Sequence, residues 1–331
     1  MQQFWERLYI ATIAPIQSLV SLQSSFNVMF LALTLLFCVG IYSFRAGRFL
    51  GLRTLRRLLF PRHIFLHDSA KLDYKYYAIA TALRAGVLGS MVVSSSAVAG
   101  IATFTLSSVL GPSVPLAAPS PLILLVATVV QVLLFDLGYW IAHRTMHAIP
   151  LLWEFHKPHH AAEVLTPATS ARSHPVDDLI QTNFTACTLG LGYGVLVYAF
   201  GEAAQPLKLL ETNIIFLAYF LTIFHLRHSH VWLPIRGWLG YIIQSPAHHQ
   251  IHHSMDPRHQ GKNLGFCLSV WDWAFGTLYT PDVREALQFG LGQEGEDFAT
   301  VKDLFLRPFG KASGLFATRE KSRPLIAKHK T

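Results

Sequence analysis

The chain has 331 residues, of which 52% are hydrophobic and only 14% are charged, and its mean hydropathy is +0.36. Soluble globular proteins carry about 25% charged residues, so this composition excludes a disordered chain and argues against a water-soluble one. The excess of 27 basic over 19 acidic residues suits an anionic membrane surface or a nucleic acid. Because the hydropathy favours the membrane, we expect no nucleic-acid partner.

Apolar stretches close to the roughly 20 residues that a helix needs to cross a bilayer predict the membrane spans. In chain order they are Phe26–Phe44, Ala85–Phe104, Pro121–His143, Asn183–Gly201 and Leu209–Phe224. Glu211 interrupts the last stretch, and only a short connector, 202–208, separates it from the fourth. We therefore expect the fourth and fifth stretches to form a hairpin that crosses the bilayer either fully or in part.

The distribution of basic residues predicts the orientation of these spans. The loop between the first two spans is rich in Lys and Arg, namely Arg45, Arg48, Arg53, Arg56, Arg57, Arg62, Lys71 and Lys75, whereas residues 106–120 carry no charge. The first loop is therefore expected in the cytosol, and within it residues 49–59 suit either an interfacial amphipathic helix or a solvated basic loop. Counting on, residues 143–183 and 232–331 are also cytosolic, in a bacterial inner membrane or, in a eukaryote, the endoplasmic reticulum.

Histidines are the most unusual feature of the sequence. Twelve of the 17 fall within the windows 143–147, 156–160, 225–230 and 248–253. The segments HRTMH (143–147), HKPHH (156–160) and HQIHH (249–253) space their histidines by three or four residues, which places the imidazoles of each segment on one helical face. All four windows lie at the predicted cytosolic ends of spans or in cytosolic segments, so these side chains can meet in one place.

Such a number of imidazoles exceeds the four to six ligands that one metal ion accepts, so two ions are implied. Nitrogen ligands suit iron, copper or zinc rather than magnesium or calcium. The scarcity of carboxylates among the clusters argues against a carboxylate-bridged di-iron bundle. The fold we predict is all-α, a multi-pass membrane protein with a cytosolic helical cap that carries the histidine boxes.

The three boxes, in this order after a span that contains Asp136, resemble the fatty acid hydroxylase and sterol desaturase superfamily of integral-membrane oxygenases. The stretches EVLTP (163–167), RSHP (172–175), NLG (263–265) and WDWAFGTLY (271–279) strengthen this resemblance. It implies metal ligation by His143, His147, His156, His159, His160, His249, His252 and His253. A further ligand is implied from the 225–230 window, where we prefer His228 and place His225 second; His230 stands where the family commonly has Asn.

Three other residues are candidates for supporting roles. Asp136 lies on the same helical face as His143 and either fixes a ligand tautomer or makes an interhelical hydrogen bond. His174 either orients a ligand imidazole or occupies a turn before a proline. Asn263 either holds a metal-bound water or caps a loop.

The resemblance divides the chain into an N-terminal membrane region (1–120), a catalytic domain (121–280) and a cytosolic tail (281–331). It implies O₂-dependent hydroxylation or desaturation of a membrane lipid by two iron ions, the lipid being a fatty acyl chain, a sterol or a related apolar molecule. The sequence shows no flavin, haem-domain or ferredoxin motif, so an external donor, a reductase, ferredoxin or cytochrome b5-like carrier, is expected to supply the electrons.

Three other classes of protein also bind metals or haem through histidine in membranes. A metal transporter needs polar residues at the membrane midplane, a bis-His haem protein needs histidine pairs on different spans, and a metal-dependent hydrolase would use zinc. The position and spacing of the histidines favour the oxygenase over all three.

Overall fold

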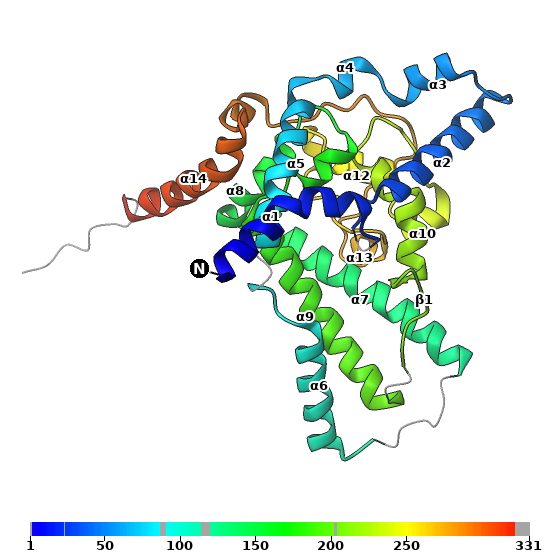
Figure 1. Ribbon diagram of the computed structural model, residues 1–331, viewed down its shortest axis with the longest axis vertical. Coiled ribbons are helices and arrows are strands. Elements are labelled where there is room, and N and C mark those ends of the chain that lie inside the picture. Colours follow the sequence, from blue (N-terminus) through cyan, green and yellow to red (C-terminus); the bar gives the residue numbers. More distant parts are fainter. Residues whose placement is uncertain (1, 23, 87–90, 114–119, 202–203, 322–331) are drawn as a thin grey trace, which may run out of the picture.

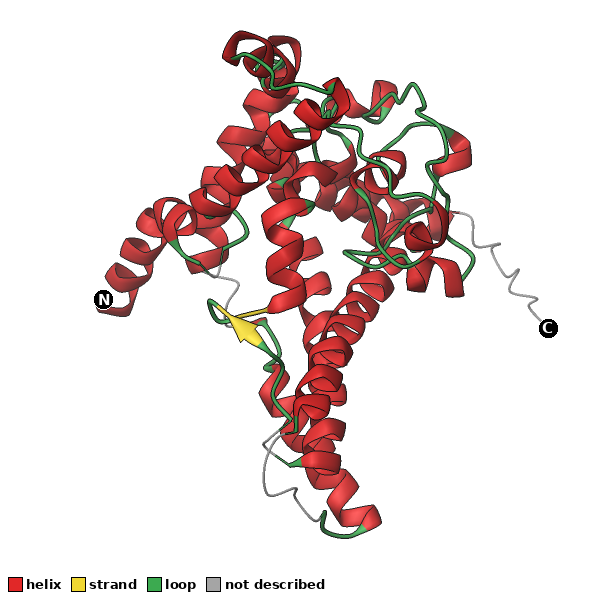
Figure 2. Ribbon diagram, turned by 90° about the vertical axis from the view of Figure 1, so that its right-hand side faces the viewer, coloured by secondary structure: helices red, strands yellow, loops and turns green. Residues whose placement is uncertain are grey.

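The computed structural model describes residues 2–22, 24–86, 91–113, 120–201 and 204–321. These residues form helices and one short two-stranded ribbon, which confirms the predicted all-α fold (Figure 2). Among them, three helices are long and apolar enough to cross a membrane: α2 (Val28–Ala46), α7 (Pro121–Ala148) and α9 (Pro175–Phe200). They correspond to the first, third and fourth predicted spans.

Helices α7 and α9 lie side by side and form a stem that projects from the rest of the molecule (Figures 1 and 2). Gly138 on α7 makes this contact possible, because a Cβ atom there would lie 2.7 Å from the Cα of Thr185 and 2.9 Å from the carbonyl oxygen of Phe184. Helix α6 (Ser95–Leu110) packs on the other side of α9, where a Cβ on Gly194 would lie 2.6 Å from that of Ala102. Small residues therefore set the spacing of the stem, as in other membrane helix pairs.

The predicted span Ala85–Phe104 is wrong as a single helix. Helix α5 (Asp68–Gly86), which packs against α1 (Gln2–Val20), ends where the predicted span begins. Helix α6 begins only at Ser95. The side chain of Ser94 accepts a hydrogen bond from the backbone N–H of Ala97 and so caps α6. The prediction from hydropathy included this N-cap serine in the span because the residue is uncharged.

The predicted fifth span is also divided. Strands β1 (Lys208–Leu209) and β2 (Thr212–Asn213) pair antiparallel around Leu210 and Glu211, which both have positive φ. Helix α10 (Ile214–Thr222) then has only nine residues and is followed by the single turn α11 (Phe224–Arg227). Of the two outcomes expected for this hairpin, the short helix agrees with a partial crossing.

The remaining elements form a helical head at the end of the stem (Figure 1). They are α3 (Leu52–Leu59), α4 (Arg62–Phe65), α8 (Pro150–His160), η2 (Pro167–Ala171), η3 (Gly237–Tyr241), α12 (Pro246–His252), η4 (Pro257–His259), α13 (Val270–Ala274), η5 (Gly292–Phe298) and α14 (Val301–Lys321). Several of these begin with proline, whose fixed φ suits the first helical position. Leu59 of α3 is buried against Cys38, Leu226 and Val231, so the basic segment is a packed amphipathic helix rather than a solvated loop.

Candidate metal centre

Nine histidines gather in the head in two adjacent groups. His143, His147, His156, His160 and His252 form the five-histidine group, and His159, His228, His249 and His253 form the four-histidine group. Within each group, one ring nitrogen from every residue lies within 4.8 Å of all the others. All nine of these residues are among the ligands predicted from the sequence.

Three helices and one turn supply these side chains. The last two turns of α7 carry His143 and His147, and α11 ends just before His228. Helices α8 and α12 each supply both groups, because neighbouring histidines at the end of each helix point to different groups. The rings of His160 and His253, which belong to different groups, have centroids 4.6 Å apart, so the two groups are in direct contact.

The separations between ring nitrogens fit a metal ion. With metal–nitrogen bonds of about 2.0–2.1 Å, neighbouring ligands lie about 2.9–3.3 Å apart and opposite ligands about 4.1 Å apart. The Nε2 atom of His156 is 3.2 Å from that of His143 and 3.2 Å from that of His160. In the four-histidine group, the Nε2 atom of His228 lies 2.9–3.2 Å from those of His159, His249 and His253.

Hydrogen bonds on the far side of three rings fix which nitrogen faces the centre. Nδ1 of His143 donates to the carbonyl oxygen of Leu264 at 2.8 Å, and Nδ1 of His252 donates to that of Lys262 at 2.8 Å. Nδ1 of His156 donates to the carboxylate of Asp177 at 2.7 Å. A neutral imidazole that donates through Nδ1 keeps a lone pair on Nε2. Three lone pairs thus converge in a buried space, an arrangement that a metal cation stabilises.

His249 has a different outer partner. Nη2 of Arg227 lies 2.8 Å from Nδ1 of His249, and since a guanidinium only donates, this nitrogen accepts. Arg227 is itself buried, at 2% exposed, and forms no ion pair with the described residues. Its charge stands next to the four-histidine group, where it would offset negative charge that develops on a metal-bound imidazole.

Burial keeps six of these histidines neutral. In the head, burial lowers the pKa values of His159, His160, His228, His249 and His253 well below their ordinary value. Burial also lowers the pKa of His252, to about 3. At neutral pH these imidazoles are uncharged, and each keeps one nitrogen lone pair, as metal ligation requires. His249 differs, because its Nδ1 accepts from Arg227 and its Nε2 would have to lose a proton to bind a metal.

Asp136 acts on a loop and not directly on a histidine. Its carboxylate accepts hydrogen bonds from the backbone N–H groups of Cys267, at 2.6 Å, and Leu268, at 3.0 Å. Asp272 holds the same loop, accepting from the N–H groups of Leu264 and Gly265. Neither of the two roles considered for Asp136 is therefore observed, because its bonds run from a helix to the loop whose Leu264 carbonyl orients His143.

His174 and Asn263 have structural partners instead of contacts with the histidine groups. His174 caps α9: Nδ1 accepts from the N–H of Val176, and Nε2 donates to the carbonyl of Phe305. Asn263 adopts a φ of 54°, donates to the carbonyls of His248 and Tyr279, and accepts from the N–H of Tyr279. Neither residue contacts the histidine groups in the role predicted for it. His174 is the N-cap before Pro175, close to the alternative of a turn residue before a proline, and Asn263 caps a loop, which was its alternative.

His225 lies outside both groups, contrary to its prediction as a ligand. The helix ends at Arg227, and His228 has φ −101° and ψ 74°, so the one-face spacing expected of positions three residues apart is lost. The His225 ring packs instead against Phe26 and Phe224. His230 is also elsewhere, with Nε2 donating to the carbonyl of Leu58.

Sequence reasoning missed Asp177 and Arg227, the charged partners of His156 and His249. Asp177 had a weak signal, as an acidic residue in the first turn of a helix directly after the RSHP stretch. Arg227 had one too, as a cation between two histidines at the end of an apolar segment. The carbonyl groups of Lys262 and Leu264 had no such signal in the sequence, since every residue has a backbone carbonyl.

Comparison with known proteins places the histidine groups in a family. The model of the fatty acid hydroxylase family matches residues 128–277, which contain all nine histidines. Human alkylglycerol monooxygenase is 26% identical over 183 residues, 55% of this chain and 37% of that protein. No solved structure is significantly similar.

The names of two further relatives refer to other lipids. Ornithine lipid hydroxylase of Rhizobium tropici is 26% identical over 163 residues, 49% of this chain and 45% of that protein. Rat lathosterol oxidase is 30% identical over 177 residues, half of each chain. The matched segments thus span half or less of these relatives' length. The family match, these relatives and the apolar helices together identify a membrane protein of the fatty acid hydroxylase and sterol desaturase superfamily.

Proposed function

We propose that this protein is an O₂-dependent lipid oxygenase that uses two iron ions, one in each histidine group, to hydroxylate or desaturate a membrane lipid. The observation that carries the proposal is the pair of adjacent, buried, all-imidazole groups within the hydroxylase domain. Iron held by nitrogen ligands with an open position reduces O₂ to an oxidant able to attack an unactivated C–H bond. Hydroxylation is preferred, because two of the three relatives named above are a monooxygenase and a hydroxylase.

The chain's own residues would hold and orient the metals and keep water away. The imidazoles provide the ligands, and Asp177 together with the Leu264 and Lys262 carbonyls fixes three of them in the tautomer that exposes Nε2. Eight of the nine histidines are buried and His147 is half-buried, which would limit solvent access to the reacting centre. The histidines lie at the head end of the stem, where the basic loop suggests the cytosolic side of the membrane.

The geometry disfavours the three alternatives. A catalytic zinc site has three protein ligands and an open position, whereas these groups offer four and five imidazoles. A transporter site lies at the middle of the spans, whereas His143 and His147 are in the last turns of α7. Haem needs two histidines on opposite sides of a porphyrin, and nitrogens about 3 Å apart leave no room for one.

An external electron donor remains part of the proposal. Four basic residues that follow the last predicted span could dock an acidic carrier, namely Arg258, Lys262, Arg307 and Lys311. Of these, Arg258, Arg307 and Lys311 are already paired with carboxylates of this chain. Lys262 is left, and its ammonium donates to the carbonyl of Gly276. A docking face for the donor is therefore not assigned to these residues.

Metal content tests the proposal. The full chain is purified in detergent, loaded anaerobically with iron and analysed by plasma mass spectrometry beside His252→Ala/His253→Ala, which removes one ligand from each group. His63→Ala, an exposed histidine outside both groups, is the control. We expect about two irons per chain in the parent and control, and loss in the double variant. No stoichiometric metal, or one zinc that iron never replaces, contradicts the proposal.

Iron loading then allows the reaction itself to be measured. Loaded protein in lipid bilayer discs is given reductant and O₂, and the lipids are analysed by mass spectrometry. Addition of one oxygen atom indicates hydroxylation, and loss of two hydrogens indicates desaturation. Loaded parent that changes no lipid while consuming O₂ would contradict the lipid as the substrate.

A further inference from the structure

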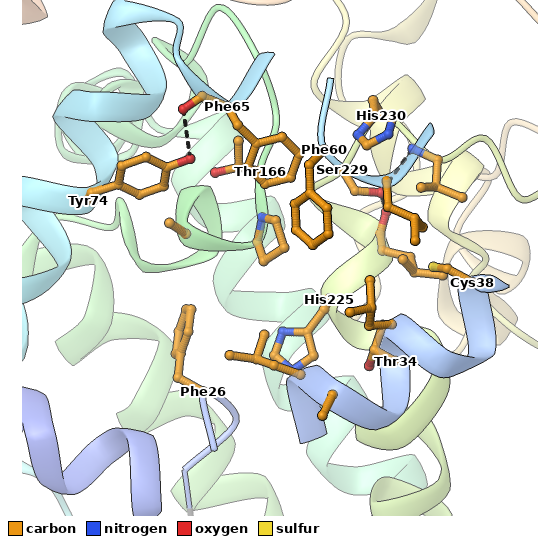
Figure 3. Close-up of a pocket in the computed structure, with 18 of the residues that line it drawn as sticks. Phe26, Thr34, Cys38, Phe60, Phe65, Tyr74, Thr166, His225, Ser229 and His230 are labelled. Carbon is orange, nitrogen blue, oxygen red and sulfur yellow. Dashed lines mark hydrogen bonds between the residues drawn. The ribbon is translucent and has the colours of Figure 1, made fainter. Parts of the chain in front are cut away.

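The head contains an apolar cavity of about 500 Å³, and Figure 3 shows side chains that line it. Its volume is within the roughly 300–1,000 Å³ of sites that bind small ligands. The wall includes residues 229–231, and Ser229 directly follows His228 of the four-histidine group. The chain segment that directly follows a member of the four-histidine group therefore forms part of the cavity wall.

Hydrocarbon side chains form most of the cavity wall. They come from α2, the α3–α4 segment and α11, and include Leu31, Leu35, Phe60, Phe65 and Leu226. Such a wall favours a hydrocarbon chain over a polar ligand, because burial of apolar surface is the main gain on binding. In a membrane protein, the most abundant molecule with such a hydrocarbon chain is a membrane lipid.

Most other polar groups in the wall are already bonded within the protein. The hydroxyl of Tyr74 donates to the carbonyl of Phe65 at 3.1 Å, as Figure 3 shows, and that of Ser229 donates to the carbonyl of Leu226 at 2.8 Å. The Nε2 atom of His230 is bonded to the carbonyl of Leu58. Oγ1 of Thr166 and Nδ1 of His230 are unpaired as well, one atom in each side chain.

His225 is different. It is 2% exposed, and neither of its ring nitrogens makes a hydrogen bond of good geometry; the nearest candidate is a weak contact with the backbone of Ser25. Figure 3 shows the ring between Phe26 and Thr34 among the cavity side chains. Burial lowers its pKa to about 4, so the neutral imidazole keeps one donor and one acceptor. Leaving both unpaired in an apolar cavity is costly, and buried groups of this kind call for a partner.

A hydroxyl group both donates and accepts, so it can pair with either nitrogen of His225, whereas an alkane can pair with neither. We propose that the cavity holds one hydrocarbon chain of the lipid substrate and that His225 hydrogen-bonds a hydroxyl group of that lipid. His225 is then a substrate-binding residue that selects hydroxyl-bearing lipids and fixes the chain beside the metal centre. The inference rests on the proposed function for calling this lipid the substrate, and on the cavity alone for the binding.

Competition for photo-crosslinking tests the binding without any metal. The metal-free full chain in bilayer discs is labelled with a long-chain alcohol that carries a diazirine, and the label is competed with a primary alcohol or with the alkane of the same length. In the parent, we expect the alcohol to compete about tenfold better than the alkane, the effect of one buried hydrogen bond. Peptide mapping should place the label on the cavity wall.

Three variants assign the preference to His225. His225→Phe should remove the tenfold difference, and His225→Gln should restore part of it, because an amide also donates and accepts. Tyr74→Phe should keep it, since that hydroxyl is already bonded to Phe65. Equal competition by alcohol and alkane in the parent, a preference that survives in His225→Phe, or a label outside the cavity wall overturns the inference.

Measuring the iron content of each variant distinguishes a failure of this inference from a failure of the proposed function. His225 lies outside both histidine groups, so its variants should load as much iron as the parent. If His225→Phe loses iron together with the preference, the His225→Gln variant decides: normal iron with weakened preference supports the inference, and normal iron with an unchanged preference overturns it. Failure of iron loading in the parent would refute the proposed function and leave the binding result standing.

Discussion

The carboxylate of Asp177 accepts a 2.7 Å hydrogen bond from Nδ1 of His156, and both side chains are more than nine-tenths buried. Asp177 belongs to the first turn of α9, whereas His156 belongs to α8. The bond therefore joins a membrane-spanning helix to a ligand of the five-histidine group. A carboxylate in this position raises the basicity of the imidazole and fixes its tautomer.

Asp177→Asn should weaken iron binding by about 10–100-fold, the usual cost of losing such an outer partner. Equilibrium iron titration with a competing chelator measures the change. Asp178→Asn is a matched control, because Asp178 pairs with Arg84 and Ser173 and contacts no histidine of the groups. Equal iron affinity in the parent and Asp177→Asn would show that the bond has no influence on the metal.

A second buried pair supports α8 from the other side. Nη1 of Arg172 lies 3.0 Å from the Asp73 carboxylate, and Nε of Arg172 donates to the carbonyl of Pro158, between two ligands. Asp73→Asn leaves the arginine charge buried and should lower the free energy of unfolding by about 3–5 kcal/mol. Asp73→Asn/Arg172→Met should recover part of this loss. Denaturant unfolding in detergent checks both, and a single variant as stable as the parent would contradict the prediction.

The contact between α7 and α9 allows a test by one methyl group. Gly138→Ala places a Cβ against Thr185 and Phe184 and forces the helices apart, which should cost about 1–3 kcal/mol and reduce iron retention. Gly40→Ala on α2, where a Cβ meets nothing within 4 Å, should leave both quantities close to those of the parent. Thermal unfolding and iron content measure the two effects. Similar losses in both variants would mean that the close packing of the stem is not responsible.

Acid should destabilise the protein through His225. Its pKa is about 4 in the folded state and about 6.5 in the unfolded state, so the unfolded chain takes up the proton first as the pH falls. Stability from the neutral ring is complete above pH 6.5 and declines between pH 6.5 and 4, by up to about 3 kcal/mol. His225→Phe should lose correspondingly less over this range in unfolding experiments. Parallel pH profiles for the parent and the variant would contradict this assignment.

The sequence predicted most of the metal centre and less of the membrane region. Histidine spacing within a helix is local information, which is why nine predicted ligands come together. His225 failed because the chain leaves the helix before His228, a change that spacing does not reveal. Asp177 and Arg227 were missed because the histidines they contact are distant from them in sequence. The predicted span from Ala85 was wrong because a hydropathy average does not register Ser94, an uncharged residue that caps a new helix.

His159 and His160 are neighbours in the chain but serve different histidine groups, and so do His252 and His253. At each of these two places one peptide bond therefore joins the two proposed metal sites. An ion that orders one group would also order α8 and α12, which are two of the three segments that form the other group, so binding of the first ion should lower the entropic cost of binding the second. Loading should then be positively cooperative, with little of the chain present in a form that holds one ion.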